Sequence, residues 1–115
     1  REPEAVRSLW HAGLRVVTLS RGSLGSTWFT STASRDVPTF KVEAVDTTGA
    51  GDGFMAGLLA GLLAAPDAVT DAAALDAICR FANAVGALTT LQRGAIPALP
   101  TRHDVERFML GKETL

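Results

Sequence analysis

The sequence is poor in the features that mark specialised classes of protein. It has a single cysteine, Cys79, which excludes an internal disulfide and fits a reducing, cytoplasmic compartment. Its net charge is −1, whereas a nucleic-acid-binding surface or a polybasic membrane patch needs an excess of positive charge. Its longest apolar run, residues 54–65, is shorter than the roughly 20 residues that cross a bilayer, and no secretory leader pattern opens it. We expect a cytoplasmic globular protein that binds neither nucleic acid nor membrane.

The composition is that of a globular protein, and the order of the predicted strands and helices indicates an α/β fold. The 115 residues are 47% hydrophobic and 20% charged, an ordinary globular balance. The chain opens at Arg1 and not at a methionine, so we expect either a processed protein or a piece of a longer one. Apolar periodicity and helix punctuation predict helices over 2–12, 50–65, 71–92 and 102–110, and strands over 14–20, 26–30 and 40–45, with a polar loop over 31–36. So few strands make a thin sheet, which we do not expect this chain to cover fully.

The most informative segment is residues 46–57, DTTGAGDGFMAG, where a predicted strand ends, a glycine-rich turn follows and a helix begins. The first amides of a helix have no intrahelical acceptor and carry the positive end of the helix dipole. Gly49, Ala50 and Gly51 remove side-chain bulk, so a phosphate can approach the backbone closely. The segment therefore predicts an anion hole for a phosphoryl group.

Asp52 is an unexpected residue within such a hole, because its carboxylate repels the anion. It fits if it takes a proton from a hydroxyl that attacks the anion, help that is typically worth roughly 10²–10⁴-fold in rate. The alternative is that Asp52 only satisfies first-turn amides and the helix dipole, and the spacing leaves both open. Gly57 and Gly61 fall on one face of the helix, which indicates close packing against a neighbouring element. A dinucleotide fingerprint is disfavoured, because its acidic partner would be Asp71, at the start of a helix.

Several other residues that often serve in sites are interpreted as structural. Cys79 lies in a mostly apolar helical pattern, so we expect a small buried hydrophobe and not a reactive thiol. His11 and His103 lie on or beside predicted surface helices, where we expect them to be solvated. Trp10 and Trp28 are interpreted as packing residues.

Residues 46–54 resemble the C-terminal signature of the ribokinase-like (PfkB) carbohydrate kinases, with seven consecutive matching positions. The segment SRGSLG over 20–25 looks like the nucleotide loop of that family, and residues 80–83 and 92–97 look like its closing segments. The flanking segments look most like fructokinases. The resemblance spans all of residues 1–115 but only about the C-terminal third of a typical member. It implies an α/β fold: the C-terminal, nucleotide-binding and catalytic portion of the three-layer α/β/α ribokinase-like architecture, without the N-terminal substrate half and lid.

The resemblance implies an ATP-dependent kinase that phosphorylates the primary hydroxyl of a sugar, most similar to enzymes that convert D-fructose to fructose 6-phosphate. Asp52 would be the base, the amides of Gly49, Ala50 and Gly51 would hold the γ-phosphoryl group, and Mg²⁺ would be carried by the ATP phosphates. The alternatives are a ribokinase, a 2-keto-3-deoxygluconate kinase or, for this piece alone, a nucleotide- or phosphate-binding module without activity, or merely a stable remnant. A homodimer is expected for the full-length protein.

The resemblance also assigns two sets of binding residues. The nucleotide would be bound by Ser20, Arg21, Gly22, Gly25, Gly51 and Asn83, although spacing alone places Asn83 as an amide on a helix surface. A monovalent cation, usually K⁺ in this family, would be bound by Asp46, Thr48, Thr89, Gln92, Gly94 and Ala98. A carboxylate with several carbonyls suits a hard, weakly held cation, but a turn-forming role for Asp46 also stays open.

Overall fold

The chain folds as a helix, a small sheet and then a group of helices. The computed structural model describes residues 2–11, 13–91 and 100–111. In chain order its elements are α1 (Glu2–Leu9), β1 (Val17–Ser20), β2 (Ser26–Phe29), β3 (Ser34–Val37), α2 (Ala50–Ala64), α3 (Ala72–Thr89) and α4 (Arg102–Leu110). Short 3₁₀ helices, Gly22–Leu24 and Pro66–Thr70, lie between β1 and β2 and between α2 and α3.

The three strands form one antiparallel sheet in the order β1-β2-β3. Trp28 of β2 lies opposite Thr18 of β1 and Arg35 of β3, so the first two predicted strands form and pair with each other as a hairpin. The loop predicted over residues 31–36 is wrong, because β3 begins within it. Three of the four β3 residues are exposed, as is common in an edge strand, so the backbone pairing with β2 left no hydrophobic pattern in the sequence.

The strand predicted over residues 40–45 does not form. Phe40 makes only an isolated bridge, and the residues after it are irregular. Phe40 is nevertheless 2% exposed, because it packs with Val85 of α3 and Val105 of α4 in a second core cluster. Packing against helices, and not a sheet, therefore buries Phe40, while Val42 is only half-buried and Ala44 is exposed.

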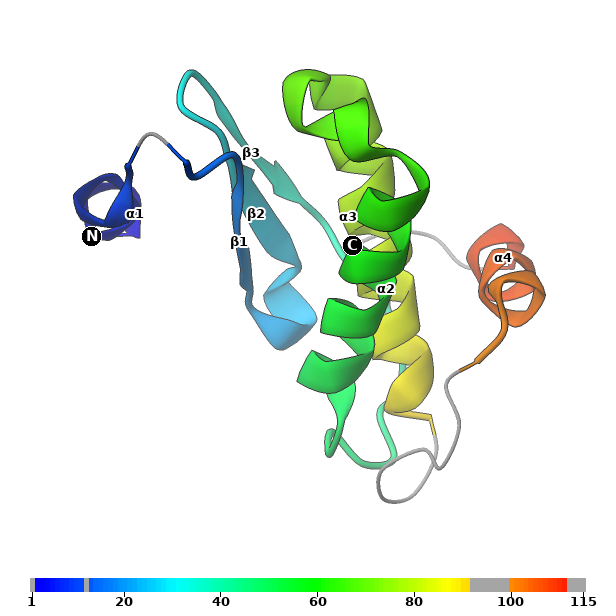
Figure 1. The fold of residues 1–115 in the computed structure, drawn as a ribbon. Helices are drawn as coiled ribbons and strands as arrows, with labels where there is room; N and C mark the ends of the chain where they lie inside the picture. Colours follow the sequence, from blue (N-terminus) through cyan, green and yellow to red (C-terminus); the bar gives the residue numbers. More distant parts are fainter. Residues whose placement is uncertain (1, 12, 92–99, 112–115) are drawn as a thin grey trace.

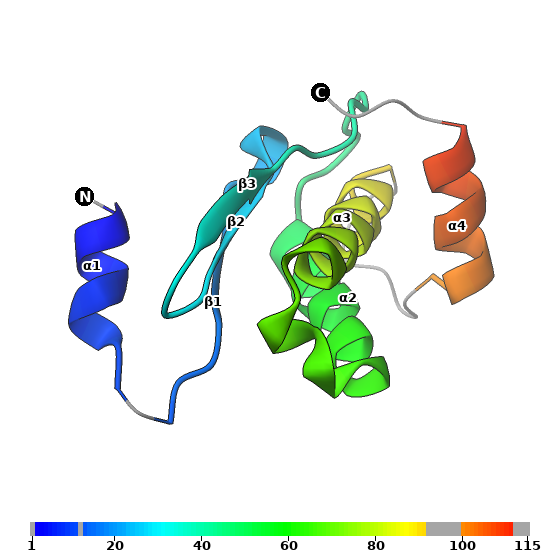
Figure 2. The same cartoon turned by 90° about the horizontal axis from the view of Figure 1, so that it is seen from above.

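The elements are arranged in layers (Figures 1 and 2). The views agree that α1 lies on one side of the sheet, that α2 and α3 lie together on the other side, and that α4 lies beyond α3. The main core fills the space between the sheet and the helix pair, where Trp28 and Val37 meet Leu58, Leu75 and Cys79. The α3 helix has the length and mean hydropathy, 1.2, of a membrane span, but its contacts with the sheet, α2 and α4 are those of a core helix.

Glycines allow α2 and α3 to pack very closely. A Cβ atom built on Gly57 would lie 2.9 Å from Cα of Ala82, and one built on Gly61 would lie 2.8 Å from Cγ2 of Ile78. Real Cβ atoms do not approach neighbours this closely. The packing role predicted for these two glycines is therefore confirmed, and the partner is α3.

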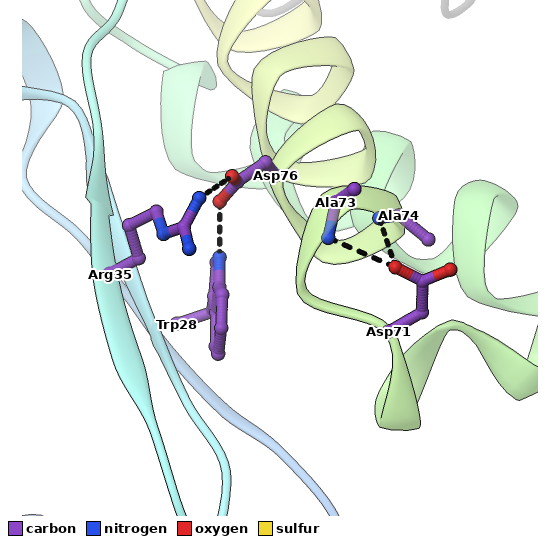
Figure 3. Close-up of polar contacts among 6 residues, drawn as sticks. All are labelled: Trp28, Arg35, Asp71, Ala73, Ala74 and Asp76. Atoms are coloured by element: carbon purple, nitrogen blue, oxygen red, sulfur yellow. Dashed lines mark hydrogen bonds and ion pairs between the residues drawn. The ribbon is translucent and has the colours of Figure 1, made fainter.

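Side chains cap two of the helices. Asp71 is the N-cap of α3: its carboxylate accepts hydrogen bonds from the amides of Ala73 and Ala74 at 3.0 and 3.2 Å (Figure 3). Thr101 caps α4 as its position in the sequence suggests, in a capping box with Asp104. The α3 helix ends at Thr89, three residues before the predicted end.

A polar contact joins the sheet to α3 (Figure 3). The indole Nε1 of Trp28 donates to Oδ1 of Asp76 at 2.8 Å, and Arg35 forms an ion pair with Oδ2 of the same carboxylate at 2.7 Å. Trp28 is 1% exposed, so its packing role is confirmed. Cys79 is fully buried on the same helix, and burial raises the pKa of its thiol to about 11, which confirms it as a structural residue. His11 and His103 are exposed, as expected.

Candidate functional site

The turn that precedes α2 leaves the start of this helix without a side-chain cap. Oδ1 of Asp46 accepts a hydrogen bond from the Thr48 amide at 2.9 Å, which closes a tight turn. Gly49 is the N-cap residue, with φ 84° in the left-handed region that favours glycine, and it makes no side-chain cap hydrogen bond. The Ala50 amide donates to the Thr47 carbonyl at 3.2 Å. Unlike the capped first turns of α3 and α4, the first turn of α2 therefore presents the Gly51 amide to a bound anion.

Asp52 and Gly51 lie on this helix tip and face outward. Asp52 is exposed in the first turn of α2, and its carboxylate forms no hydrogen bond with another residue in the described part of the chain. A Cβ atom built on Gly51 would meet nothing within 4 Å. The carboxylate is thus not committed to capping its own helix, and the backbone beside it is open. This arrangement favours the base interpretation of Asp52 over the purely structural one.

A cavity of about 230 Å³ adjoins the helix tip. Four segments form it: the glycine loop after β1, the irregular stretch after β3, the start of α2 and one face of α3. Its lining residues are Ser20, Gly22, Ser23, Gly25, Thr39, Phe40, Lys41, Val42, Ala44, Thr47, Ala50, Gly51, Phe54, Asn83, Gly86, Ala87 and Thr90. A largely apolar cavity beside an open helix N-terminus can hold a flat heterocycle and the phosphates attached to it.

The glycine loop predicted to bind nucleotide lies at this cavity, but one of its residues turns away. Ser20, Gly22 and Gly25 line the cavity, whereas Arg21 does not. The Arg21 guanidinium donates to the Thr27 hydroxyl of β2, and that hydroxyl donates to Asp36 of β3 at 2.6 Å. The Arg21 side chain therefore fixes the loop to the hairpin, and its contribution to nucleotide binding stays a prediction.

Asn83 is buried and not on the helix surface, so the interpretation from spacing alone is wrong. It is 5% exposed, and its Nδ2 donates to the carbonyl oxygens of Val37 and Pro38 at 3.1 and 3.2 Å. The residue also lines the cavity, which is compatible with the expected place near a base. The α3 sequence does not reveal that this amide donates hydrogen bonds to two backbone carbonyls far away in the chain.

Sequence reasoning missed the stretch over residues 39–44 as part of the site. Five of its six residues line the cavity. The apolar residues Phe40, Val42 and Ala44 were the available signal, but they predicted a strand. In the structure these three line the cavity together with the polar Thr39 and Lys41, so the wall does not follow the alternation.

Two of the predicted cation ligands, Asp46 and Thr89, lie where two chain segments meet. The Thr90 carbonyl, at the end of α3, accepts from the amides of Val45 and Asp46 at 2.7 and 3.0 Å. Thr89 is the last residue of α3, where carbonyl groups have no intrahelical donor. A carboxylate and backbone carbonyls are ligands that fit a monovalent cation. Gln92, Gly94 and Ala98 lie outside the described residues, and Thr48 follows Asp46 in the turn.

Two further observations concern metal-binding groups and a second cavity. Among residues 2–11, 13–91 and 100–111, no group of three or more His, Cys, Asp or Glu side chains could hold a metal ion. A larger hollow of about 760 Å³ lies near Trp10, Thr30 and Val69, at the other end of α2 and α3 from the α2 N-terminus. It is therefore separate from the anion-binding turn.

Comparisons with known proteins identify the family to which this arrangement belongs. Residues 2–102 match the pfkB family of carbohydrate kinases. The chain is 44% identical over 112 residues to the Arabidopsis thaliana protein named Probable fructokinase-3, and 38% identical over 110 residues to fructokinase from Solanum tuberosum. These alignments cover 97% and 96% of the chain but 32% and 34% of the relatives, so the chain spans about a third of their length.

Solved structures confirm the expected fold. A fructokinase from Xylella fastidiosa with bound ATP superposes with a TM-score of 0.85 at 29% identity, over 95% of this chain and 36% of that one. A fructokinase from Vibrio cholerae O395, with fructose, ADP and calcium ion bound, gives 0.80 at 33% identity, over 92% and 34%. The prediction of part of a ribokinase-like α/β fold is thus confirmed. Together with the family match, these likenesses show that the chain belongs to the pfkB family of carbohydrate kinases.

Proposed function

We propose that this chain is the nucleotide-binding and catalytic portion of an ATP-dependent sugar kinase, and that the whole protein converts D-fructose to fructose 6-phosphate. The observation that carries the proposal is the joint placement of an uncapped helix N-terminus, an exposed Asp52 and an apolar cavity. Both fructokinase structures named above hold an adenine nucleotide, and one also holds fructose. The identity to plant fructokinases favours fructose over ribose or 2-keto-3-deoxygluconate.

In this proposal the nucleotide is divided between the two parts of the site. The adenine enters the cavity between the glycine loop and α3, and the phosphates extend toward the start of α2. The amides at Gly49, Ala50 and Gly51 then face the γ-phosphoryl group, and that of Ala50 exchanges its hydrogen bond to the Thr47 carbonyl for one to the phosphoryl oxygen. Such charge-assisted hydrogen bonds stabilise the negative charge that the group carries during transfer. Mg²⁺ supplies further charge neutralisation on the phosphates when it is bound with ATP.

Asp52 acts on the acceptor. Its carboxylate takes the proton of the sugar hydroxyl as the hydroxyl oxygen forms a bond to the γ-phosphorus. The bond between that phosphorus and the bridging oxygen of ADP breaks, and ADP keeps the electron pair. The amides and the carboxylate share one helix turn, so a single rigid element orients the electrophile and the base.

A monovalent cation would be held where the turn meets the end of α3. Asp46 and Thr48 would supply ligands on one side and Thr89 on the other, and the family resemblance adds Gln92, Gly94 and Ala98 to the set. A fructokinase variant from Vibrio cholerae O395 was solved with fructose, ADP and potassium ion, which supports K⁺ as the ion. A positive charge here would strengthen the anion hole at the neighbouring turn. We also propose a cytoplasmic homodimer for the whole protein, which rests on the family resemblance alone.

The direct test is Asp52→Asn in the whole protein, with ADP formation measured against fructose. We expect kcat to fall by roughly 10²–10⁴-fold, with ATP binding retained because the variant removes a negative charge from an anion site. Asp67→Asn is the matched control, since Asp67 is also exposed but lies after the far end of α2. Near wild-type turnover of Asp52→Asn would contradict the assignment of the base.

The substrate is tested separately. The whole protein is assayed for ADP formation with fructose, ribose, 2-keto-3-deoxygluconate and adenosine, each with and without K⁺. Fructose is expected to give the highest kcat/KM, and K⁺ to raise the rate. A higher kcat/KM for another acceptor would replace fructose as the substrate but leave the kinase mechanism in place.

A further inference from the structure

A stretch without regular structure forms one wall of the nucleotide cavity. Residues 39–44 contribute five of its lining residues, yet they contain no helix and only the isolated bridge at Phe40. A strand or helix would hold such a wall through its own hydrogen bonds. Here the wall must be held from outside, by contacts from α3 and, at Phe40, also from Val105 and Phe108 of α4.

Two residues of α3 and Thr90, which follows the last residue of this helix, contact the connection along its length. Asn83 donates two hydrogen bonds to the carbonyls of Val37 and Pro38, where the stretch begins. The Arg80 guanidinium lies 4.8 Å from the centre of the Phe40 ring. The Thr90 carbonyl accepts from Val45 and Asp46 at the far end.

Two of these contacts are made by side chains on one face of the helix, and the third by the backbone just after it. Residues 80 and 83 are separated by three positions, a spacing that places them on the same side, and Thr90 follows the last residue of α3. Together the contacts span the connection from β3 to the turn before α2. They link the wall of the nucleotide cavity to the helix tip that would bind phosphate.

We propose that Arg80 and Asn83 are positioning residues that set the nucleotide cavity by holding its wall, and that Asn83 does not act mainly as a contact to the base. This inference rests on the proposed nucleotide-binding function. Two carbonyl oxygens can only accept, so the amide nitrogen must face them, and both of its hydrogens are then used. A base could still meet the side-chain oxygen, but the two donors serve the protein.

Arg80 allows the role of holding the cavity wall to be separated from that of contacting the base. It is not one of the cavity-lining residues, so any effect on nucleotide binding has to pass through Phe40. Its Nη1 is buried without a hydrogen-bond partner among the described residues, so the ring is the partner that the structure gives to this part of the side chain. A cation held over an aromatic ring in a desolvated place restrains that ring.

The matched control is a second contact of the same kind. The Arg102 guanidinium of α4 lies over the Phe81 ring of α3, also at 4.8 Å, and neither residue lines the cavity. Arg80→Met and Arg102→Met each remove a guanidinium from a ring and keep a long apolar side chain. Only the ring under Arg80, that of Phe40, belongs to the wall of the nucleotide cavity.

The experiment measures binding of ATP, GTP and inorganic tripolyphosphate to the whole protein by calorimetry without sugar, and kcat and KM for ATP. For Arg80→Met we expect the Kd and KM for ATP to rise by roughly 3- to 10-fold, with kcat changed less than about twofold. Arg102→Met should leave all three within about twofold. Asn83→Asp places a carboxylate against two carbonyls, so it should weaken ATP and GTP by the same factor, about tenfold or more, and leave tripolyphosphate unchanged.

Each outcome decides between the alternatives. Equal effects of Arg80→Met and Arg102→Met would overturn the positioning role, even if Asn83→Asp does not fold. A loss for ATP but not for GTP in Asn83→Asp, with Arg80→Met unchanged, would make Asn83 a direct contact to the base. A wild-type protein that binds no ATP would overturn the proposed function itself, and this inference with it, whereas ATP binding that no variant alters would overturn this inference alone.

Discussion

Replacing Gly57 by alanine tests the closeness of α2 and α3, on which the position of the site depends. In the middle of an ordinary helix, Gly→Ala stabilises a protein by roughly 1 kcal/mol, since alanine has the better helix propensity. At Gly57 the new methyl group would lie 2.9 Å from Cα of Ala82 and 3.0 Å from Cγ2 of Val85. The nearer atom is backbone in the middle of a helix, so it cannot be relieved by a change of rotamer.

The sign of the effect follows from comparing the two contributions. Overpacking in a close-packed interface costs typically about 1–3 kcal/mol, which exceeds the gain in propensity when the contact is this short. We expect Gly57→Ala to lower the free energy of unfolding by roughly 1–2 kcal/mol. Gly51→Ala in the same helix is the control, because its methyl group would meet nothing within 4 Å and should leave stability unchanged or raise it.

The assay is urea unfolding of the whole protein followed by far-ultraviolet circular dichroism, with both variants measured beside the wild type. The midpoint should fall for Gly57→Ala and hold or rise for Gly51→Ala, with an unchanged slope. A Gly57→Ala protein as stable as Gly51→Ala would refute the reasoning, since it would mean that the helices separate without cost.

Two further predictions concern the interior of the domain. Asp76→Ala leaves the buried indole N–H of Trp28 unpaired and should lower the free energy of unfolding by about 1–3 kcal/mol. Asp76→Asn keeps an acceptor for the indole and loses only the exposed ion pair with Arg35, worth about 1 kcal/mol or less. Equal losses of stability in thermal unfolding would contradict the role of Asp76 as the acceptor for Trp28. Burial raises the pKa of Cys79 from 9.0 to about 11, so its thiol stabilises the fold fully below pH 9, and this stabilisation is lost as the pH rises toward 11. Unfolding measured across that range should lose stability in the wild type and lose less in Cys79→Ala.

The helix that carries the site could be predicted because its signals are local. The glycine-rich turn, the apolar run after it and Pro66 define α2 within one residue of its end. The anion-binding character of its start also follows from the sequence, since it depends on backbone geometry and on small side chains next to one another. The Thr101 cap of α4 was predictable for the same reason.

The elements that were missed depend on contacts distant in the sequence. The β3 strand has three exposed polar residues and exists because β2 offers it a backbone partner. Residues 40–45 have the alternation of a strand, but Phe40 meets α3 and α4 instead. Asn83 looks like a surface amide until the backbone of Val37, 46 positions earlier, is placed against it. Such pairings leave no trace in a local window of sequence.

The glycines of the site segment are present for three different physical reasons. Gly49 has φ 84°, which a residue with a side chain rarely adopts, so it allows the turn into the helix. Gly51 faces open space, and in the proposed mechanism that space is where the phosphoryl group approaches.

Gly53 faces the other way. A Cβ there would lie 2.6 Å from Oγ1 of Thr89 and 3.2 Å from the Val85 carbonyl, so its absence lets the first turn of α2 rest on the end of α3. Thr90, which follows that end, also accepts the amide hydrogen bonds of Val45 and Asp46, before the turn. The anion-binding turn is thus fixed from both sides by α3, and the closeness of the helix pair is a condition for the geometry of the site as well as for stability.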